Sequence, residues 1–277
     1  MTTAALPYTF FLLMLELTAG GLWALLFADA RGMVDRGFVK WSAFMLLASA
    51  AVTLWVALAV EVPGVVDGYR LDPRWMDPVR VVLGVLVGVC AAHTFATFRG
   101  HRAAGLFWGG AGSLVGLAAL ALTAGVFREP TWSYAGTLAS LLAGSAALGT
   151  VSAGMVLGHW YLTTPRLSEQ PLKELTLVLL GALAVQAAVM VVNAVPAVRE
   201  VPQSSIALSV GLAQNPAFWF RVAVGLVFPA VLAYMAWKAS AIRGMMSATG
   251  LLYIAMGAVL TGEVLARGLL FVTGKPV

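Results

Sequence analysis

Four ionisable residues interrupt long apolar stretches of this chain: Glu16, Arg221, Glu263 and Arg267. An unpaired charge at a bilayer centre costs about 2.5–3.5 kcal/mol on insertion scales, so such residues usually pair or serve a function. Glu263 and Arg267 are four residues apart, so we expect them to pair on one helix face. Arg221 can pair with Glu263 or with Glu16. Glu16 has the least obvious partner, which makes it the candidate for exchanging protons.

Two interpretations of these charges stay open. In the first, two carboxylates and two guanidiniums neutralise one another and hold three helices together. In the second, Arg221, Glu263 and Arg267 line a polar pocket for a quinone, Asn193 shares their depth, and the Glu16 carboxylate exchanges protons with the bound headgroup. A quinone needs an apolar slot with a few polar groups at its end.

The histidines allow a further chemistry. His93 lies inside an apolar run, His101 follows in a short loop, and His159 precedes Trp160 and Tyr161. Two histidines on adjacent helices can ligate a b-type haem, so His93 and His159 are the ligand candidates if haem is present. Alternatively, they cap helix ends and bind headgroups at the membrane interface. His159 and Tyr161 could also hydrogen-bond a quinone carbonyl.

Other catalytic and metal chemistry finds little support in the sequence. The single cysteine, Cys90, can form neither an internal disulfide nor the thiolate set of an iron–sulfur centre. We find no Ser/His/Asp triad and no carboxylate motif that would complete a metal site. We therefore expect no metal site and no independent hydrolytic activity.

The elements that carry these residues are expected to be membrane spans. Hydrophobic residues make up 61% of the 277-residue chain and charged residues only 10%, against roughly a quarter in soluble domains. A span needs about 20 apolar residues at 1.5 Å rise each. Eight stretches qualify: Tyr8–Phe27, Phe38–Val60, Val79–Phe98, Ala103–Val126, Tyr134–Leu157, Leu172–Val195, Pro216–Trp237 and Met245–Val272.

The predicted fold is an all-α polytopic membrane protein, a single membrane domain over residues 1–277. The stretches are too long for barrel strands and lack strict alternation. Eight spans divide naturally into two four-helix groups at Phe127–Ser133. The loops after spans one, three, five and seven carry more lysine and arginine than the opposite loops, which places both termini outside the cell.

The remaining charge and loops suggest further contacts. The formal charge of +5 is best explained by loop cations facing anionic lipid headgroups, and no nucleic-acid partner is expected. The outer loop Glu61–Arg80, with alternating charges, is either a docking surface for a soluble partner or a solvated loop. In the second long loop, Pro196–Asn215, the apolar run Ile206–Ala213 is too short to span and fits an interfacial helix.

Two segments resemble a known family. The first span reads Leu6–Phe11 followed by Glu16–Gly21, and the last reads Gly262–Gly268 followed by Phe271. Both are similar to the first and last spans of the membrane anchor subunits of DMSO reductase and polysulfide reductase, which also have eight spans and outer termini. Together they cover about a fifth of the chain. The DMSO-reductase type carries a histidine after its second span, where this chain reads Glu61-Val62-Pro63-Gly64.

The resemblance implies a role in respiration at the bacterial cytoplasmic membrane. Such an anchor holds an iron–sulfur subunit, exchanges electrons with quinol and carries no haem. We therefore expect a quinone-interacting anchor subunit whose partner is an iron–sulfur or cytochrome subunit, and which is not catalytic alone. The alternatives are a subunit with one b-type haem, a proton or solute transporter, and a purely structural membrane subunit. A transporter is less favoured because no broken helix or inverted repeat is evident.

Overall fold

The eight predicted spans are helical in the computed structural model, which describes residues 3–164, 167–202 and 211–277, and each is long and apolar enough to cross a membrane. The predicted all-α polytopic fold is therefore confirmed. The helices are α1 (Leu6–Ala30), α2 (Arg36–Ala59), α3 (Met76–Phe98), α4 (Arg102–Phe127), α5 (Tyr134–Thr163), α6 (Gln170–Ala194), α7 (Pro216–Val222), α8 (Phe228–Ala241) and α9 (Met245–Thr273).

Sequence signals explain where several helices begin. Asp35 caps α2 by accepting a hydrogen bond from the Gly37 backbone N–H, and Ser133 caps α5 in the same way at Gly136. The predicted boundaries agree within a few residues, except that α5 continues past Leu157 to Thr163. His159 therefore lies within α5 and does not end it.

The seventh span differs from the single regular helix predicted for Pro216–Trp237. It contains two α-helical parts, α7 and α8, joined by the π-helical turn Ala223–Val227. Pro229 explains the interruption, because it has no N–H to donate to the carbonyl of Gly225 four residues earlier. π-helical turns inside α-helices frequently occur at functional sites.

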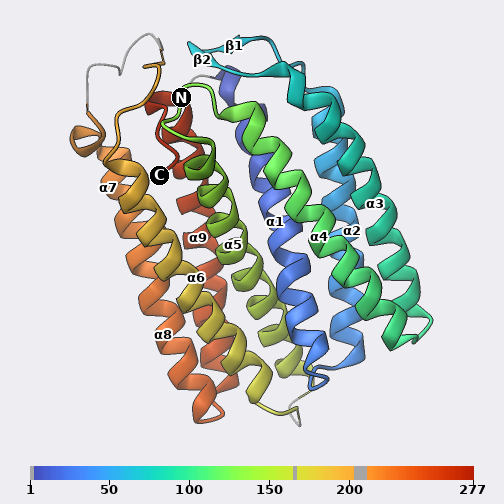
Figure 1. Ribbon diagram of the computed structural model, residues 1–277. Helices are drawn as coiled ribbons and strands as arrows, with labels where there is room; N and C mark the ends of the chain where they lie inside the picture. The colour runs from blue at the N-terminus through green and yellow to red at the C-terminus, as the bar shows by residue number, and fades with distance from the viewer. Residues whose placement is uncertain (1–2, 165–166, 203–210) are drawn as a thin grey trace.

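The helices form two four-membered groups that lie side by side (Figure 1). In the first bundle α1, α2, α3 and α4 contact one another in a ring, and in the second α5, α6, α9 and the α7–α8 span do the same. The bundles meet mainly where α1 packs against α5, with smaller contributions from α4 and α9. The predicted division into two groups agrees with this packing.

Both termini lie at the same end of the molecule, together with the hairpin (Figure 1). We call this the outer end, and the opposite end, with the α1–α2, α3–α4, α5–α6 and α8–α9 turns, the inner end. An even number of spans requires this arrangement of the termini. Large apolar side chains such as Trp55, Phe107 and Leu114 are about two-thirds exposed on the bundle surface. Acyl chains would cover them in a bilayer, as expected for a lipid-facing surface.

The outer loop Glu61–Arg80 is partly folded and not simply a solvated connection. Strands β1 (Val65–Val66) and β2 (Tyr69–Arg70) form a hairpin, followed by the 3₁₀ turn Pro73–Trp75. Fully buried Tyr69 donates its hydroxyl to the carbonyl of Phe127 and packs on Phe271 with ring centroids 5.1 Å apart. The hairpin therefore closes the outer end over helices of both bundles.

Two further 3₁₀ turns, Thr3–Ala5 and Leu212–Gln214, complete the described elements. The predicted interfacial helix at Ile206–Ala213 falls mostly on residues 203–210, outside the described part of the chain.

Glycines make the close contact between the bundles. A side chain on Gly149 of α5 would overlap the backbone of Gly20 on α1, and one on Gly20 would overlap the carbonyl of Ser145. Small residues at such positions let membrane helices approach closely, and these two glycines have that role between α1 and α5. By contrast, Gly84 on α3 has nothing within 4 Å of an added Cβ atom.

We expect Gly149→Ala to lower the free energy of unfolding by about 1–3 kcal/mol, because the added methyl overpacks the α1–α5 contact. Gly84→Ala is the matched control, and it should be neutral or stabilising by up to about 1 kcal/mol since alanine favours helix. Thermal unfolding of both variants in detergent measures the difference. Equal melting temperatures would contradict a tight helix contact at Gly149.

Candidate functional site

The four ionisable residues meet in one buried group, which we call the ion cluster: Glu16 of α1, Arg221 of α7, and Glu263 and Arg267 of α9. Each side chain is at most 1% exposed. The two acids balance the two bases, so the cluster can be neutral inside the membrane. Such balance lowers the large cost of burying ions in hydrocarbon.

Glu263 is the centre of the ion cluster. Its Oε1 atom accepts hydrogen bonds from Arg221 Nη2 at 3.1 Å and from the amide of Gln186 on α6. Its Oε2 atom accepts one from Arg267 Nη2, also at 3.1 Å, as predicted from the four-residue spacing. Three donors from three helices therefore satisfy the two oxygens of this carboxylate.

Glu16 is the only member of the cluster on the first bundle. Its Oε1 atom lies 2.6 Å from Arg267 Nη2, so Glu16, the residue with the least obvious partner in the sequence, pairs with Arg267, whereas Arg221 binds Glu263. The pair was not evident because α1 and α9 are far apart in sequence. Nevertheless, neither Glu16 oxygen accepts a well-directed hydrogen bond from the described residues. Glu16 is thus held mainly by charge attraction to a single guanidinium.

Glycine provides the space that the ion cluster occupies. A Cβ atom on Gly144 of α5 would lie 2.7 Å from Glu263 Oε2 and 2.9 Å from Arg267 Nη2. It would also lie 3.0 Å from Glu16 Oε1. Any larger residue at position 144 would therefore displace the charged groups.

The π-helical turn positions Arg221. Its Nη1 atom donates a hydrogen bond of 3.3 Å to the carbonyl of Gly225. This is the carbonyl that receives no hydrogen bond from Pro229, because proline has no backbone N–H. The guanidinium also fills the space left by two touching glycines, Gly225 and Gly262. A Cβ atom added to Gly225 would lie 2.6 Å from Arg221 Nη1, and a Cβ atom added to Gly262 would lie 2.7 Å from the same nitrogen. The interruption of the seventh span is therefore part of the site.

Gln186, Ser140 and Gly144 complete the cluster, although the sequence alone does not predict them as site residues. Ser140 accepts a hydrogen bond from Arg267 Nη1 at 3.1 Å through its hydroxyl oxygen, and its carbonyl accepts another from Nη2. Gln186 could have been found, because it is an amide in the middle of an otherwise apolar span. For Ser140 and Gly144 no signal distinguishes them from the other small residues of α5.

Asn193 does not contact the ion cluster. It is buried near the outer end of α6, where its amide donates to the carbonyls of Gly136 and Pro276 at 2.9 and 2.7 Å. Its oxygen accepts a hydrogen bond from the Trp132 indole at 2.9 Å. With these partners Asn193 fastens the α4–α5 connection and the C-terminal tail to α6.

The histidines have partners in different bundles. His93 is buried between α3 and α4, where its Nδ1 atom lies 2.9 Å from the carbonyl of Gly105. His159 is exposed, and its Nδ1 atom lies 3.2 Å from the hydroxyl of Tyr253 on α9. His101 is exposed in the α3–α4 turn. The fold thus does not bring His93 and His159 together, and a haem between them stays a prediction without support from the packing.

One cavity lies on the seam between the bundles, within the membrane-spanning region. Its volume is about 220 Å³, and α1, α2, α5 and α9 contribute to its walls. We call this cavity the seam slot. It is lined by Leu17, Gly21, Leu25, Ser42, Met45, Leu46, Ser49, Gly149, Ser152, Ala153, Met155, Val156 and Met256.

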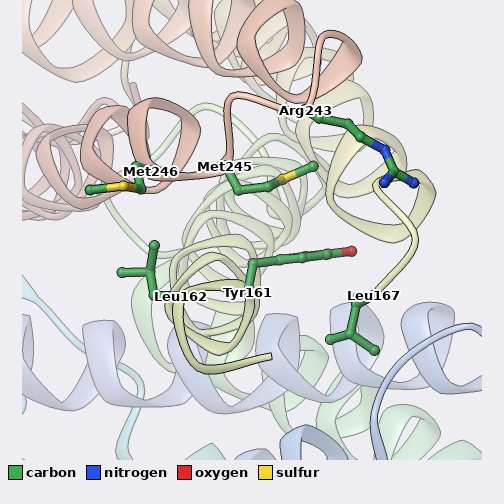
Figure 2. A pocket seen from close by; sticks show the side chains of 6 residues that line it. All are labelled: Tyr161, Leu162, Leu167, Arg243, Met245 and Met246. Carbon is green, nitrogen blue, oxygen red and sulfur yellow. The ribbon is translucent and has the colours of Figure 1, made fainter. Parts of the chain in front are cut away.

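A second pocket, of about 400 Å³, opens at the inner end of the second bundle (Figure 2). Tyr161 and Leu162 face Met245 and Met246 across it, with Arg243 at one side. Arg243 pairs with Glu169 at 2.8 Å. Hydrogen bonds from the backbone and from Arg243 lower the pKa of the partly exposed Glu169 carboxyl. Along α9 this pocket is about 27 Å from Glu263, at 1.5 Å per residue, so it is separate from the ion cluster.

Comparisons of the chain with protein families, with curated proteins and with solved structures give no match. Within residues 3–164, 167–202 and 211–277, no group of three or more histidine, cysteine or acidic side chains could hold a metal ion. The ion cluster itself presents two carboxylates, two guanidiniums and the amide of Gln186.

Removal of one partner should reveal how strongly the ion cluster couples the bundles. We expect Arg267→Gln to destabilise the protein by about 3–5 kcal/mol, because Glu16 loses its partner inside the membrane. The double variant with Glu16→Gln restores neutrality and should be less destabilised than the sum of the single variants by about 1–3 kcal/mol.

A double-mutant cycle measured by unfolding in detergent provides the test. The exposed pair Arg70–Glu200, 2.8 Å apart, is the matched control and should couple by less than about 1 kcal/mol. A coupling between Glu16 and Arg267 as small as that of the control pair would rule out a stabilising ion pair.

Proposed function

We propose that this protein is the membrane subunit of a respiratory, quinone-linked oxidoreductase. It anchors an iron–sulfur or cytochrome subunit and passes electrons between that partner and the quinone pool. The observation that carries the proposal is Glu16, a fully buried membrane carboxylate with one ionic partner and unused hydrogen-bonding capacity. The resemblance of the first and last spans to oxidoreductase anchor subunits adds support, since those segments hold Glu16, Glu263 and Arg267.

Quinol chemistry requires such a group. Oxidation of a quinol releases two electrons and two protons, so a site inside the membrane needs a proton acceptor as well as an electron acceptor. A single carboxylate can serve only if it takes the protons one at a time and releases the first before it accepts the second. Electrons pass to the redox group of the partner subunit. A proton on Glu16 breaks one ion pair, whereas a proton on Glu263 would disturb bonds to Arg221, Arg267 and Gln186. Glu16 is therefore the carboxylate that exchanges protons, and Glu263 keeps both arginines in place.

The outer end offers a surface for the partner subunit. The hairpin and the following turn carry Arg70, Asp72 and Arg74, and Arg74 is largely exposed while its guanidinium binds Asp72 at 2.9 Å. Hydrogen bonds from Arg74 lower the pKa of the Asp72 carboxyl, so this pair stays ionised at neutral pH. With the loop cations at the inner end facing the cytoplasm, this surface lies outside the bacterial cytoplasmic membrane.

We expect Glu16→Gln to lower quinol-linked turnover of the assembled complex by about 100-fold, the range of general acid–base catalysis. The amide keeps the shape of the side chain but cannot accept the proton. The measurement is quinol oxidation in membranes, normalised to the amount of assembled complex by immunoblot.

Glu169→Gln is the control, because Glu169 is a carboxylate at the inner end, away from the ion cluster and from the outer loop, and should leave turnover unchanged. Glu16→Asp, which keeps the ionisable group, should retain more activity than Glu16→Gln. Full turnover of Glu16→Gln at normal assembly would remove Glu16 from the reaction.

A further inference from the structure

The ion cluster itself cannot admit a quinone ring in this conformation. Its four charged side chains are at most 1% exposed, and those of Glu16, Glu263 and Arg267 are packed against Gly144. If the protein handles quinone, the ring must therefore bind at a neighbouring place that is open to the lipid phase. The seam slot is such a place: exposed Met45 lies in its wall, and Leu17, the residue after Glu16 on α1, lies at its outer end.

The seam slot has the form expected for a quinone site. Its walls are apolar except for three serine hydroxyls, and exposed Met45 lies at its rim. Ligand sites of this kind combine apolar walls with a few polar groups that fix orientation. The volume suits a flat ring and the beginning of its chain, while the rest of an isoprenoid tail can extend past Met45 into lipid.

Ser42 is the unusual member of the lining. Serines within a helix commonly bond to the carbonyl four residues earlier, as Ser152 does to Leu148 at 2.6 Å. Ser49 instead shares a hydrogen bond of 2.7 Å with Thr18. The buried hydroxyl of Ser42 has no hydrogen-bond partner among the described residues. A hydroxyl without a partner in an apolar site is costly, and a ligand carbonyl would satisfy it.

Glycines keep the slot between the bundles. Gly21 and Gly149 line it at the level where α1 and α5 touch, and a side chain on Gly21 would overlap that of Leu46. Ser42 and Ser49 are seven residues apart on α2, so the slot extends about 10 Å along the membrane normal. One end thus lies beside the segment that carries Glu16, and the other lies at Ser42.

From these observations we infer that the seam slot binds the quinone, with the Ser42 hydroxyl donating a hydrogen bond to one ring carbonyl. This assignment rests on the proposed function, which it deepens by naming the binding site. A ring bound at Ser42 lies between the bundles on the inner half of α1, about 13 Å from Glu16 along the helix axis, because Ser49 is level with Thr18 and Ser42 is seven residues closer to the inner end on α2. The quinol must therefore move along the slot toward Leu17 before Glu16 takes its proton. Ser42 is a binding residue and Glu16 a proton acceptor.

The test is equilibrium binding of short-chain ubiquinone and menaquinone analogues to the purified, delipidated protein in detergent. We expect Ser42→Ala to weaken binding by about 2- to 10-fold, the effect of one neutral hydrogen bond. Ala153→Trp fills the slot and should abolish binding. The controls are Ser113→Ala, whose hydroxyl bonds within its own helix, and Leu114→Trp on the lipid-facing surface; both should bind as the wild type does.

The outcomes of these experiments test the slot assignment and the proposed function separately. If the wild type binds an analogue and Ser42→Ala and Ala153→Trp bind it equally well, the slot assignment is wrong while the proposed function stands. If the wild type binds neither analogue, the proposed function fails as well. Photo-crosslinking with an azidoquinone should label residues of the slot; capture of phospholipid there in place of the quinone would also overturn the assignment. Should Ala153→Trp not fold, Ser42→Ala decides alone.

Discussion

The neutralisation of two carboxylates by two guanidiniums inside the membrane is the interaction on which the rest of this structure depends. Glu16 comes from the first bundle, whereas Arg221, Glu263 and Arg267 come from the second. Because ions are so costly in hydrocarbon, separation of the bundles would leave Glu16 without a partner. The ion pair therefore acts together with the apolar and glycine contacts of α1 and α5 to hold the bundles in one register.

Glycines and a π-helical turn in the surrounding helices make room for the ion cluster. Gly144 leaves the space in which three charged side chains meet, and touching glycines at positions 225 and 262 leave space for Arg221. The π-helical turn before Pro229 frees a carbonyl that Arg221 then satisfies. These features cost helix stability individually, since glycine and proline are poor helix formers. Their occurrence at one level of the membrane is best explained by the need to solvate buried ions with protein groups.

The same seam brings together the features of the proposed chemistry. The bundles approach most closely at Gly20 and Gly149, with the ion cluster on the outer side of this contact and the seam slot extending from it toward the inner end. The buried carboxylate of Glu16 and an apolar cavity thus share one interface between the two bundles.

The sequence alone determined the fold class, the eight spans and the identity of the buried charges, because apolar length and the cost of ions in lipid are local properties. It also predicted the Glu263–Arg267 pair, since residues four apart share a helix face. Only the tertiary structure decided that Glu16 pairs with Arg267 and that Gln186 joins the cluster. It also decided which predicted site residues have their hydrogen-bond partners outside the cluster: Asn193, His93 and His159. Those contacts depend on which helices become neighbours and how each is rotated, and that choice follows from packing at glycines distant in sequence.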